Sequence, residues 1–260
     1  MNKNQFISDV SLLTTSSNSL VGKQVLNISL AESTMDEVKE LAKLGAREGL
    51  VVIADNQSRG RGRFNREWLT TSGQDLTISI LFQPALNQVH MLNMVASLAI
   101  QETISEITQK EAEIKWPNDV LVNGKKISGV LIETVMSTAT HVDFAVVGIG
   151  LNVNLNPLVM DAIKDSATSI SLITGALTDK YEVLSKLLSM IDRQYQLVLE
   201  GRDLCIDWAT KVSTIGNKVK VSNGSKIISG YAVDLDSVGN LILETKQGRV
   251  KVTSGDVTLI

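Results

Sequence analysis

The sequence predicts an α+β protein, in which a mixed, largely antiparallel sheet with helices is followed by a small β-barrel. Strand-like and helix-like apolar patterns alternate along the first 212 residues. Asn123-Gly124 lies between two apolar runs and is a strong hairpin signal, which favours antiparallel pairing. From Gly216 onward, short alternating segments are separated by Asn-Gly, Gly-Asn and Gln-Gly turns. We expect an extension over 1–23, the larger domain over 24–212 and the barrel over 213–260.

The first part of the larger domain is predicted to contain strands and two helices. The strands are expected over 25–30, 50–54 and 76–82. One helix begins after Ser33, where Ser33 and Asp36 have the spacing of a capping box, and ends at Gly45. Apolar residues at helical spacing predict the second helix over 91–107.

The second part begins with a hairpin. Pro117 interrupts any strand ladder, and beyond it Val120 to Val122 should pair antiparallel with Ile127 to Val135. A further strand over 141–154 is expected to end in a glycine-punctuated turn. Amphipathic spacing predicts a helix from Lys180 to Leu199 and another from Asp203 to Val212.

Composition restricts the class of protein. The chain has 260 residues, a formal net charge of −3, one cysteine and two histidines. The charge gives no global argument for binding nucleic acid or an anionic membrane. Cys205 excludes an internal disulfide, is expected to be a small core residue, and argues against a zinc site. The sequence has no apolar run of membrane-spanning or signal-peptide length, and we expect a cytoplasmic protein.

An arginine-rich loop, "SRGRGRFNREW" over 58–68, is the first candidate site. Gly60 and Gly62 allow the backbone to approach a ligand closely. Arg61, Arg63 and Arg66 supply planar cationic donors suited to carboxylate and phosphate groups. A solvated basic loop or an RGG-like nucleic-acid segment would give the same local pattern.

The hairpin "KWPNDVLVNGKKISG" supplies the second candidate. Lys115, Asn118 and Asp119 cluster before the turn, and Lys125 and Lys126 follow it. Because side chains alternate along a strand, at most one of these two lysines should point inward. The alternative is a hairpin that carries ordinary surface lysines.

A third segment, "GIGLNVN", follows the apolar strand that ends near residue 149. It lacks the glycine spacing and the following helix of a dinucleotide-binding fingerprint, which excludes a Rossmann interpretation. We expect a turn of close backbone approach that carries the amide of Asn152.

Four motifs together resemble the catalytic domain of biotin protein ligases, also called biotin–[acetyl-CoA-carboxylase] ligases. They are "ESTMDEVKELA", "QSRGRGRFNREW", "KWPNDVLVNGKKISGVLIE" and "GIGLNVN", and their order and spacing match. "TSGDVTL" resembles the end of the family's C-terminal SH3-like barrel. The resemblance implies that residues 24–212 form a biotin/lipoate ligase-type catalytic domain. Its fold would be related to class II aminoacyl-tRNA synthetases and shared with lipoate ligases.

The resemblance implies an enzyme that activates biotin with ATP to biotinyl-5′-AMP, releasing pyrophosphate. Biotin would then be transferred to a specific lysine of a biotin carboxyl carrier protein or domain. The implied cofactors are ATP and Mg²⁺, with the metal carried mainly by the ATP phosphates and no dedicated protein metal site. The family also implies a homodimer and no membrane partner.

The resemblance assigns site residues motif by motif. The implied biotin-binding residues are Ser33, Thr34, Met35, Gln57, Gly60, Arg61, Gly62, Arg63, Lys126 and Gly129. The implied ATP-binding residues are Arg61, Arg63, Arg66, Trp68, Lys115, Asn118 and Asn152. The implied catalytic residues are Lys115, Asp119, Lys126 and Arg63.

Two segments depart from the family pattern. Phe64-Asn65 stands where a basic or bulky residue and glycine are usual, and "TTSG" replaces Ser-Pro-x-Gly after the tryptophan. Asn65 can adopt the left-handed conformation that the turn needs. These departures bear on how tightly the closed loop holds the adenylate.

The implied reaction suits these residues. A carboxylate of pKa near ~4–5 is already ionised at neutral pH, so it needs relief from charge repulsion rather than a general base. Arginine, lysine and magnesium provide that relief. The acceptor amine, with a reference pKa near ~10.4, must lose a proton, and Asp119 is the candidate to orient it or accept the proton.

Three alternatives remain from the sequence. The first is a lipoate or octanoate ligase on the same scaffold. The second is a ligase that doubles as a repressor, but the segment before the first strand is too short for a winged helix-turn-helix, so we expect no specific DNA binding. The third is a non-enzymatic nucleic-acid-binding module, which would leave Lys115, Asp119 and Lys126 unexplained.

Overall fold

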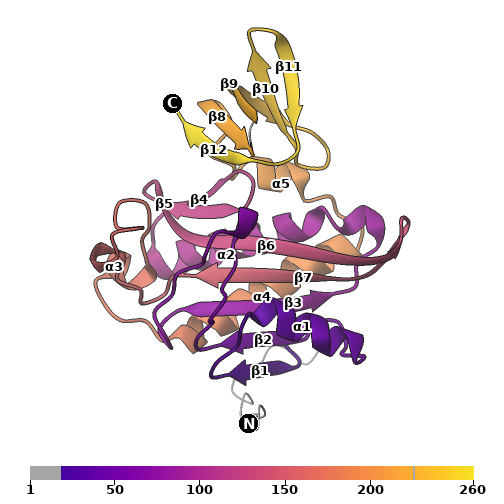
Figure 1. The fold of residues 1–260 in the computed structure, drawn as a ribbon, viewed down its shortest axis with the longest axis vertical. Coiled ribbons are helices and arrows are strands. Elements are labelled where there is room, and N and C mark those ends of the chain that lie inside the picture. Colours follow the sequence, from indigo (N-terminus) through magenta and orange to yellow (C-terminus); the bar gives the residue numbers. More distant parts are fainter. Residues whose placement is uncertain (1–18, 225) are drawn as a thin grey trace.

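The computed structural model describes residues 19–224 and 226–260. The predicted extension over 1–23 therefore lies outside the described residues as far as residue 18. Figure 1 shows a larger body built on one twisted sheet, with a smaller sheet at one end of the molecule.

The larger sheet has seven strands in the order β1-β2-β3-β7-β6-β5-β4. The strands are β1 (Val25–Ile28), β2 (Val51–Ala54), β3 (Leu76–Phe82), β4 (Ala112–Lys115), β5 (Asp119–Val122), β6 (Lys125–Thr138) and β7 (His141–Leu151). β1 and β2 are parallel, and every other neighbouring pair is antiparallel. The predicted mixed, largely antiparallel sheet is confirmed.

Helices cover both faces of this sheet. They are α1 (Thr34–Lys43), α2 (Met91–Thr108), α3 (Ile170–Thr174), α4 (Lys180–Leu199) and α5 (Cys205–Ala209). Side chains of β2 alternate between two cores, so that Val51 and Ile53 pack with α2 and α4 while Val52 packs with Val38 of α1. Short 3₁₀ turns lie at Arg63–Asn65, Leu86–Gln88 and Pro157–Val159.

The C-terminal unit is a five-stranded antiparallel sheet in the order β11-β10-β9-β8-β12. Its strands are β8 (Lys218–Asn223), β9 (Lys226–Leu235), β10 (Leu241–Thr245), β11 (Gly248–Val252) and β12 (Asp256–Leu259). Alternate residues such as Val219, Val221 and Leu243 are buried. The unit is attached to the larger body by side-chain contacts, among them a 2.9 Å hydrogen bond from Trp116 Nε1 to the carbonyl of Gly239.

Most predicted elements are present, and the differences are local. The 120–122 and 127–135 hairpin, the 76–82 strand and the 180–199 helix are confirmed, whereas the predicted 203–212 helix is shortened to α5. The predicted capping box is wrong: Ser33 occupies the N-cap position of α1 but its side chain makes no capping hydrogen bond. Asp36 instead accepts hydrogen bonds from Arg61.

The predicted glycine-punctuated turn is also wrong. Gly148 and Gly150 lie within β7, and the chain leaves the strand only after Leu151. These glycines allow close packing rather than chain reversal, because Met35 lies against Gly148 and Trp68 against Gly150. Cys205 is buried, as expected. Across the part of the chain that the structure describes, no helix has the length and apolarity needed to span a membrane.

Candidate active site

A cavity of about 680 Å³ opens on the face of the larger sheet near its centre. Its walls come from the start of α1, the arginine loop between β2 and β3, the β5–β6 hairpin and the end of β7. Segment 162–167 and Asp256 of β12 complete the lining. Every predicted site residue except Gly60 belongs to this lining.

One end of the cavity is polar but uncharged. The backbone N–H of Thr34 donates to Gln57 Oε1 at 2.8 Å, and the Thr34 hydroxyl lies 3.1 Å from the same oxygen. The Thr34 hydroxyl also shares a 2.8 Å hydrogen bond with Ser79. Ser33 and Thr34 are both buried. This network fixes hydroxyl and amide groups that suit a neutral polar ligand head.

The floor beside this polar end is apolar and closely packed. A Cβ on Gly148 would lie 2.8 Å from the sulfur of Met35, so glycine is required for Met35 to lie flat against β7. Met35, Ile78 and Ile149 line the cavity here. An apolar group attached to the neutral head would contact this floor.

The arginine loop is a closed hairpin on a fixed base. At its base the N–H of Gly73 donates to the carbonyl of Asp55, partway along the N–H of Trp68 donates to the carbonyl of Gly60, and near its tip the N–H of Gly62 donates to the carbonyl of Arg66. Phe64 and Asn65 both have a φ of 56°. The expected left-handed conformation of Asn65 is thus confirmed, and Phe64 adopts it as well, which the sequence did not indicate.

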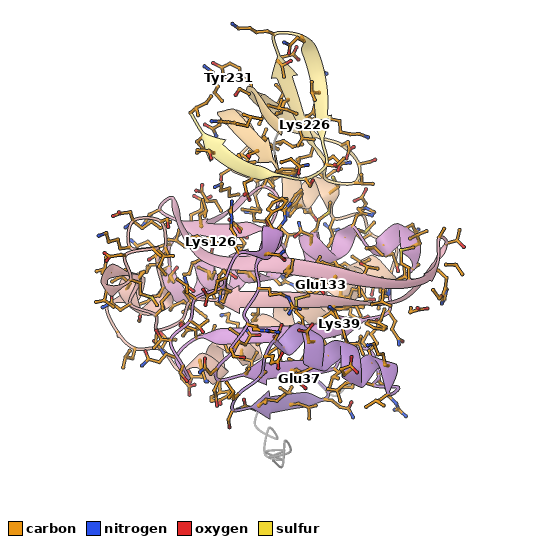
Figure 2. The ribbon with its side chains drawn as sticks, in the orientation of Figure 1. Glu37, Lys39, Lys126, Glu133, Lys226 and Tyr231 are labelled. Carbon is orange, nitrogen blue, oxygen red and sulfur yellow. The ribbon has the colours of Figure 1, made fainter. Side chains whose placement is uncertain are left out.

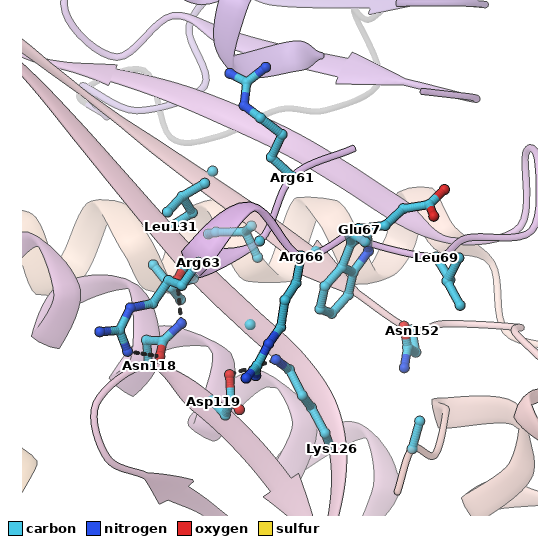
Figure 3. Close-up of a pocket in the computed structure, with 18 of the residues that line it drawn as sticks. Arg61, Arg63, Arg66, Glu67, Leu69, Asn118, Asp119, Lys126, Leu131 and Asn152 are labelled. Atoms are coloured by element: carbon cyan, nitrogen blue, oxygen red, sulfur yellow. Dashed lines mark hydrogen bonds and ion pairs between the residues drawn. The ribbon is translucent and has the colours of Figure 1, made fainter. Parts of the chain in front are cut away.

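Arg63 reaches into the cavity toward the hairpin strands, as Figure 3 shows. Its Nη1 donates to Asn118 Oδ1 at 3.0 Å and to the carbonyl of Gly255 at 3.3 Å. Asn118 is oriented in turn by a 2.6 Å hydrogen bond to the carbonyl of Val130. Burial lowers the pKa of the Arg63 guanidinium, which nevertheless stays charged at neutral pH.

The other two arginines that line the cavity are held by carboxylates. Arg61 donates to both oxygens of Asp36, at 2.6 and 2.7 Å, and points away from Arg63 and Arg66 in Figure 3. Arg66 forms an ion pair with Asp256 of the C-terminal sheet. Arg61 lines the cavity, but in this structure its guanidinium group is directed to α1.

A second charged cluster lies across the cavity on the hairpin. Lys126 Nζ lies 2.7 Å from Asp119 Oδ1 and 5.3 Å from the centre of a Trp68 ring. Lys115 faces Asp119 across the β4–β5 pair. Lys126 lines the cavity and Lys125 does not, so the expectation that only one of these lysines points inward is confirmed.

The indole of Trp68 lies on the strands beneath it. A Cβ on Gly150 would come 2.1 Å from Cε2 of this ring, and one on Gly129 would come 3.2 Å from Cζ3. The buried Nε1–H has no hydrogen-bond acceptor among the described residues. Trp68 therefore needs glycine at position 150 and packs tightly against Gly129, with its Nε1–H directed into this packing.

Asn152 lines the cavity but its amide nitrogen is already used. Nδ2 donates to the carbonyl of Thr168 at 2.9 Å, and the backbone N–H donates to the carbonyl of Ile127. These bonds hold segment 162–168 against β6. In this structure Asn152 positions the cavity wall.

Sequence reasoning missed several residues that shape the site. Asp36 and Asp256 hold two arginines, and Gly148 and Gly150 form the floor. The glycines carried a signal, because two glycines in an apolar strand favour close approach by another group. Asp256 lies 190 residues from Arg66, and no local pattern indicates that pairing.

Magnesium makes modest demands on these side chains. Among the described residues there is no group of three or more His, Cys, Asp or Glu that could hold a metal ion. Asp119 is a carboxylate in the cavity wall, and Mg²⁺ commonly binds through one or two carboxylates together with substrate phosphates. The donor set fits a magnesium ion that arrives with a nucleotide.

Comparisons with known proteins agree with this arrangement. Residues 28–152 match the biotin/lipoate A/B protein ligase family, and residues 214–259 match the biotin protein ligase C-terminal domain. The chain is 32% identical to the bifunctional ligase/repressor BirA of Bacillus subtilis, over 92% of this chain and 75% of that protein. It is 31% identical to the biotin–[acetyl-CoA-carboxylase] ligase of Paracoccus denitrificans, over 88% of this chain and 98% of that protein.

Solved structures give the same result. The chain is similar to the biotin protein ligase from Aquifex aeolicus in complex with biotin and ATP, with a TM-score of 0.77 and 33% sequence identity. That similarity covers 92% of this chain and 99% of the other.

Proposed function

Because the chain belongs to the biotin protein ligase family, we propose that its cavity joins biotin to ATP and passes the biotin to a protein lysine. The enzyme is an ATP-dependent biotin–protein ligase. It forms biotinyl-5′-AMP with release of pyrophosphate, and the acceptor is the carrier protein or domain of a biotin-dependent carboxylase.

The observation that carries this proposal is the order of environments along one cavity. Uncharged hydrogen-bonding groups at Thr34 and Gln57 adjoin an apolar floor at Met35, and the cationic groups of Arg63 and Lys126 follow. Biotin has a neutral ureido head, an apolar ring and chain, and a terminal carboxylate. The sequence of environments matches that ligand from end to end.

In the first step the carboxylate attacks the α-phosphate of ATP, and a carboxyl–phosphate bond forms as pyrophosphate leaves. Two anions must approach one another, so the chief requirement is local positive charge. Arg63, Lys115 and Lys126 surround the place where they would meet. Mg²⁺, carried by the ATP phosphates with Asp119 as the available protein carboxylate, would neutralise further phosphate charge.

We assign Trp68 to the adenine side of the cavity. Its ring is fixed over Gly150, and its buried Nε1–H lacks an acceptor among the described residues. A flat aromatic wall suits a heteroaromatic base. Asn118 would act with Arg63, to which it is already hydrogen-bonded.

In the second step the acceptor lysine amine attacks the mixed anhydride, the new amide forms and AMP leaves. The amine must first lose a proton. Asp119 lies in the cavity wall, where it accepts from Lys126 at 2.7 Å. We propose that this carboxylate orients the amine or receives its proton.

Intact mass spectrometry tests the activity. Incubation with biotin, ATP and magnesium should add one biotin to a carboxylase carrier domain, and an unchanged mass for a carrier that another ligase modifies would contradict the proposal. Parallel reactions with lipoate and octanoate separate the related ligase activity, since modification by those acids alone would identify it instead.

We further propose the domain boundaries, the cellular location and the oligomeric state of the protein. We place the catalytic domain at 24–212 and the SH3-like unit at 213–260, a division supported by the start of the second sheet at Lys218.

We propose a cytoplasmic location, where ATP is supplied, and a homodimer. Sedimentation equilibrium at micromolar concentration would reveal a single monomer species if the homodimer proposal is wrong.

We also propose that this 260-residue chain does not bind DNA specifically. The formal net charge of −3 supports that proposal, because DNA binding depends strongly on cationic contacts to phosphate. A gel shift at physiological ionic strength with an operator fragment should show no sequence preference. Binding that prefers one sequence would overturn it.

A further inference from the structure

Asp75 is a buried carboxylate that none of the preceding chemistry uses. It lies at the entry to β3 with 3% of its surface exposed, and it is not part of the cavity lining. A buried carboxylate without compensating partners is strongly disfavoured, so the partners of Asp75 define its role.

Four backbone N–H groups donate to this one side chain. Oδ1 accepts from Val153 at 2.9 Å, from Asn154 at 3.2 Å and from Leu155 at 3.0 Å. Oδ2 accepts from Thr71 at 3.0 Å. Only an acceptor with several lone pairs on both oxygens can satisfy four donors at once, and a carboxylate is the side chain that does so.

The two segments that Asp75 joins lead directly into two walls of the cavity. Thr71 lies three residues beyond Trp68, in the segment that joins the arginine loop to β3, and Val153 follows Asn152. Trp68 already touches β7, because its ring lies where a Cβ on Gly150 would be. Asp75 therefore adds a second link between the Trp68 wall and the Asn152 wall, beside the packing of Trp68 on Gly150.

Among the described residues, the opposite wall makes none of the hydrogen bonds to Asp75, and its link to the 153–155 turn is the single hydrogen bond from the N–H of Asn152 to the carbonyl of Ile127. Lys115, Asp119 and Lys126 are carried by the β4–β5–β6 strands, which are held by their own antiparallel hydrogen bonds. Loss of the Asp75 contacts should displace the nucleotide wall while the cationic cluster on the hairpin keeps its place.

We propose that Asp75 is a positioning residue that fixes the nucleotide-side walls of the cavity by fastening the arginine loop to the turn after β7. This inference rests on the proposed function for its kinetic consequence, although the positioning itself is a property of the protein without substrates. Burial raises the pKa of Asp75, and the four N–H donors oppose that effect by favouring the carboxylate.

Asp75→Asn is the principal test. The amide keeps one acceptor oxygen but presents an NH₂ group where the second oxygen was. Depending on which way the amide is turned, this NH₂ group lies opposite the N–H of Thr71 or opposite the N–H groups of 153–155, so that two donors meet without an acceptor. We expect the KM for ATP to rise roughly tenfold and biotinyl-adenylate to dissociate about tenfold faster, with kcat within about twofold of wild type.

Asp192→Asn is the matched control. Asp192 of α4 likewise binds backbone amides, with Oδ1 accepting from Leu20 at 2.7 Å and from Val21 at 2.9 Å, and it lies outside the cavity lining. It should lower the thermal midpoint without changing the KM for ATP. A purely structural role for Asp75 would give the same pattern.

Hydrogen exchange without substrates makes the test independent of activity. In Asp75→Asn the amides of residues 59–69 and 152–155 should exchange faster, with those of β5 and β6 unchanged. The inference would be overturned if Asp75→Asn matched Asp192→Asn both in the exchange of 59–69 and in the KM for ATP. Absence of ligase activity in the wild-type protein would contradict the proposed function alone, since the exchange result stands without it.

Thr71→Pro serves if Asp75→Asn fails to fold. It removes the Thr71 N–H and fixes the backbone there, and it leaves the carboxylate with its other three donors. We expect the same changes in exchange of 59–69 and in the KM for ATP, at a smaller magnitude. Unchanged values for this variant would equally overturn the inference.

Discussion

Three of the four arginines of the loop line the cavity, and their different partners separate their roles. Arg61 and Arg66 are paired with the carboxylates of Asp36 and Asp256. Arg63 donates only to an amide oxygen and a backbone carbonyl. Its charge is therefore not neutralised by a direct ion pair among the described residues, and it is the arginine of the motif best prepared for an anion.

Arg63→Ala should consequently weaken retention of the adenylate. Removal of charge-assisted hydrogen bonds in a half-buried site costs roughly 1.5–3 kcal/mol, so dissociation should speed up about ten- to a hundredfold. A stopped-flow chase of preformed biotinyl-adenylate measures this rate. Arg59→Ala is the control, because Arg59 is 77% exposed and makes only a 3.7 Å pair with Glu32. Equal rates for the two variants would refute the assignment.

For Arg61 the structure predicts an anchoring role through Asp36. The pair is bidentate but partly exposed, with 30% and 46% of the two side chains accessible, so we expect a coupling free energy of only about 0.5–1 kcal/mol. A double-mutant cycle by urea unfolding measures it, using Arg61→Ala, Asp36→Ala and the double variant. The charge-swapped Arg61→Asp/Asp36→Arg protein should recover part of the stability that Arg61→Asp loses. If the changes in unfolding free energy are additive in the cycle and in the charge-swapped protein, Arg61 has no anchoring role.

The same pair predicts a pH dependence. The hydrogen bond from Arg61 holds the pKa of Asp36 below its usual value, against the opposing effect of burial. A carboxyl group whose pKa is lower in the folded protein stabilises it at pH above the unfolded value, near ~3.9, and that contribution disappears as the pH falls through the folded pKa. The coupling between Arg61 and Asp36 should thus be present at pH 7 and shrink toward zero at acid pH.

At the scale of elements, the arginine loop and α1 are fastened to the sheet by a small charged network. Lys39 of α1 forms an ion pair with Glu133 of β6, and the two lie side by side in Figure 2. Arg61 Nη2 lies 3.8 Å from another oxygen of Glu133. The charged residues of α1 and β6 therefore hold the start of the loop at Arg61, while Asp75 holds the segment after the loop at Thr71.

The glycines of β7 give a prediction that distinguishes the two ends of the cavity. A methyl group on residue 150 would overlap the rigid Trp68 ring, whereas one on residue 148 would meet the flexible end of Met35. Gly150→Ala should therefore raise the KM for ATP at least about tenfold, as a displaced wall does in a well-fitted site. Gly148→Ala should change mainly the KM for biotin, and by less. Steady-state kinetics, with biotin and ATP varied in turn, measure both KM values. If both variants changed the KM for the same substrate, the assignment of the two glycines to different ends of the cavity would be wrong.

The sequence allowed prediction of elements whose patterns are long or uninterrupted. The 180–199 helix has five turns of amphipathic spacing, and the 76–82 strand is apolar throughout. β4 was missed because "AEIK" is a four-residue edge strand with alternating burial next to Pro117. Gly148 and Gly150 were assigned to a turn because a glycine's use for close packing depends on what lies opposite, here Trp68 and Met35.

At the scale of the whole molecule, the cavity is completed by the C-terminal sheet. The carbonyl of Gly255 accepts from Arg63, and Asp256 pairs with Arg66, so the loop before β12 contacts the arginine loop. Motif spacing predicted which residues gather within the larger domain, since they lie on adjacent strands and loops. It could not predict this contact, because the relative placement of the two sheets is set by packing such as that of Trp116 against Gly239.

Asp256→Asn tests whether that contact supports the site. The Arg66–Asp256 pair is exposed on the arginine side, with 68% of that side chain accessible, so its contribution should be modest, about 0.2–1 kcal/mol. We expect adenylate dissociation to accelerate up to about fivefold, less than for Arg63→Ala, because the Gly255 carbonyl still accepts from Arg63. The effect should fade as salt is raised from low ionic strength to about 1 M, where the screening length falls to ~3 Å. Asp234→Asn is the control: Asp234 is an exposed carboxylate of the same sheet, outside the cavity lining. If both variants retain the adenylate like wild type at low salt, the C-terminal sheet contributes to the site through the Gly255 backbone alone.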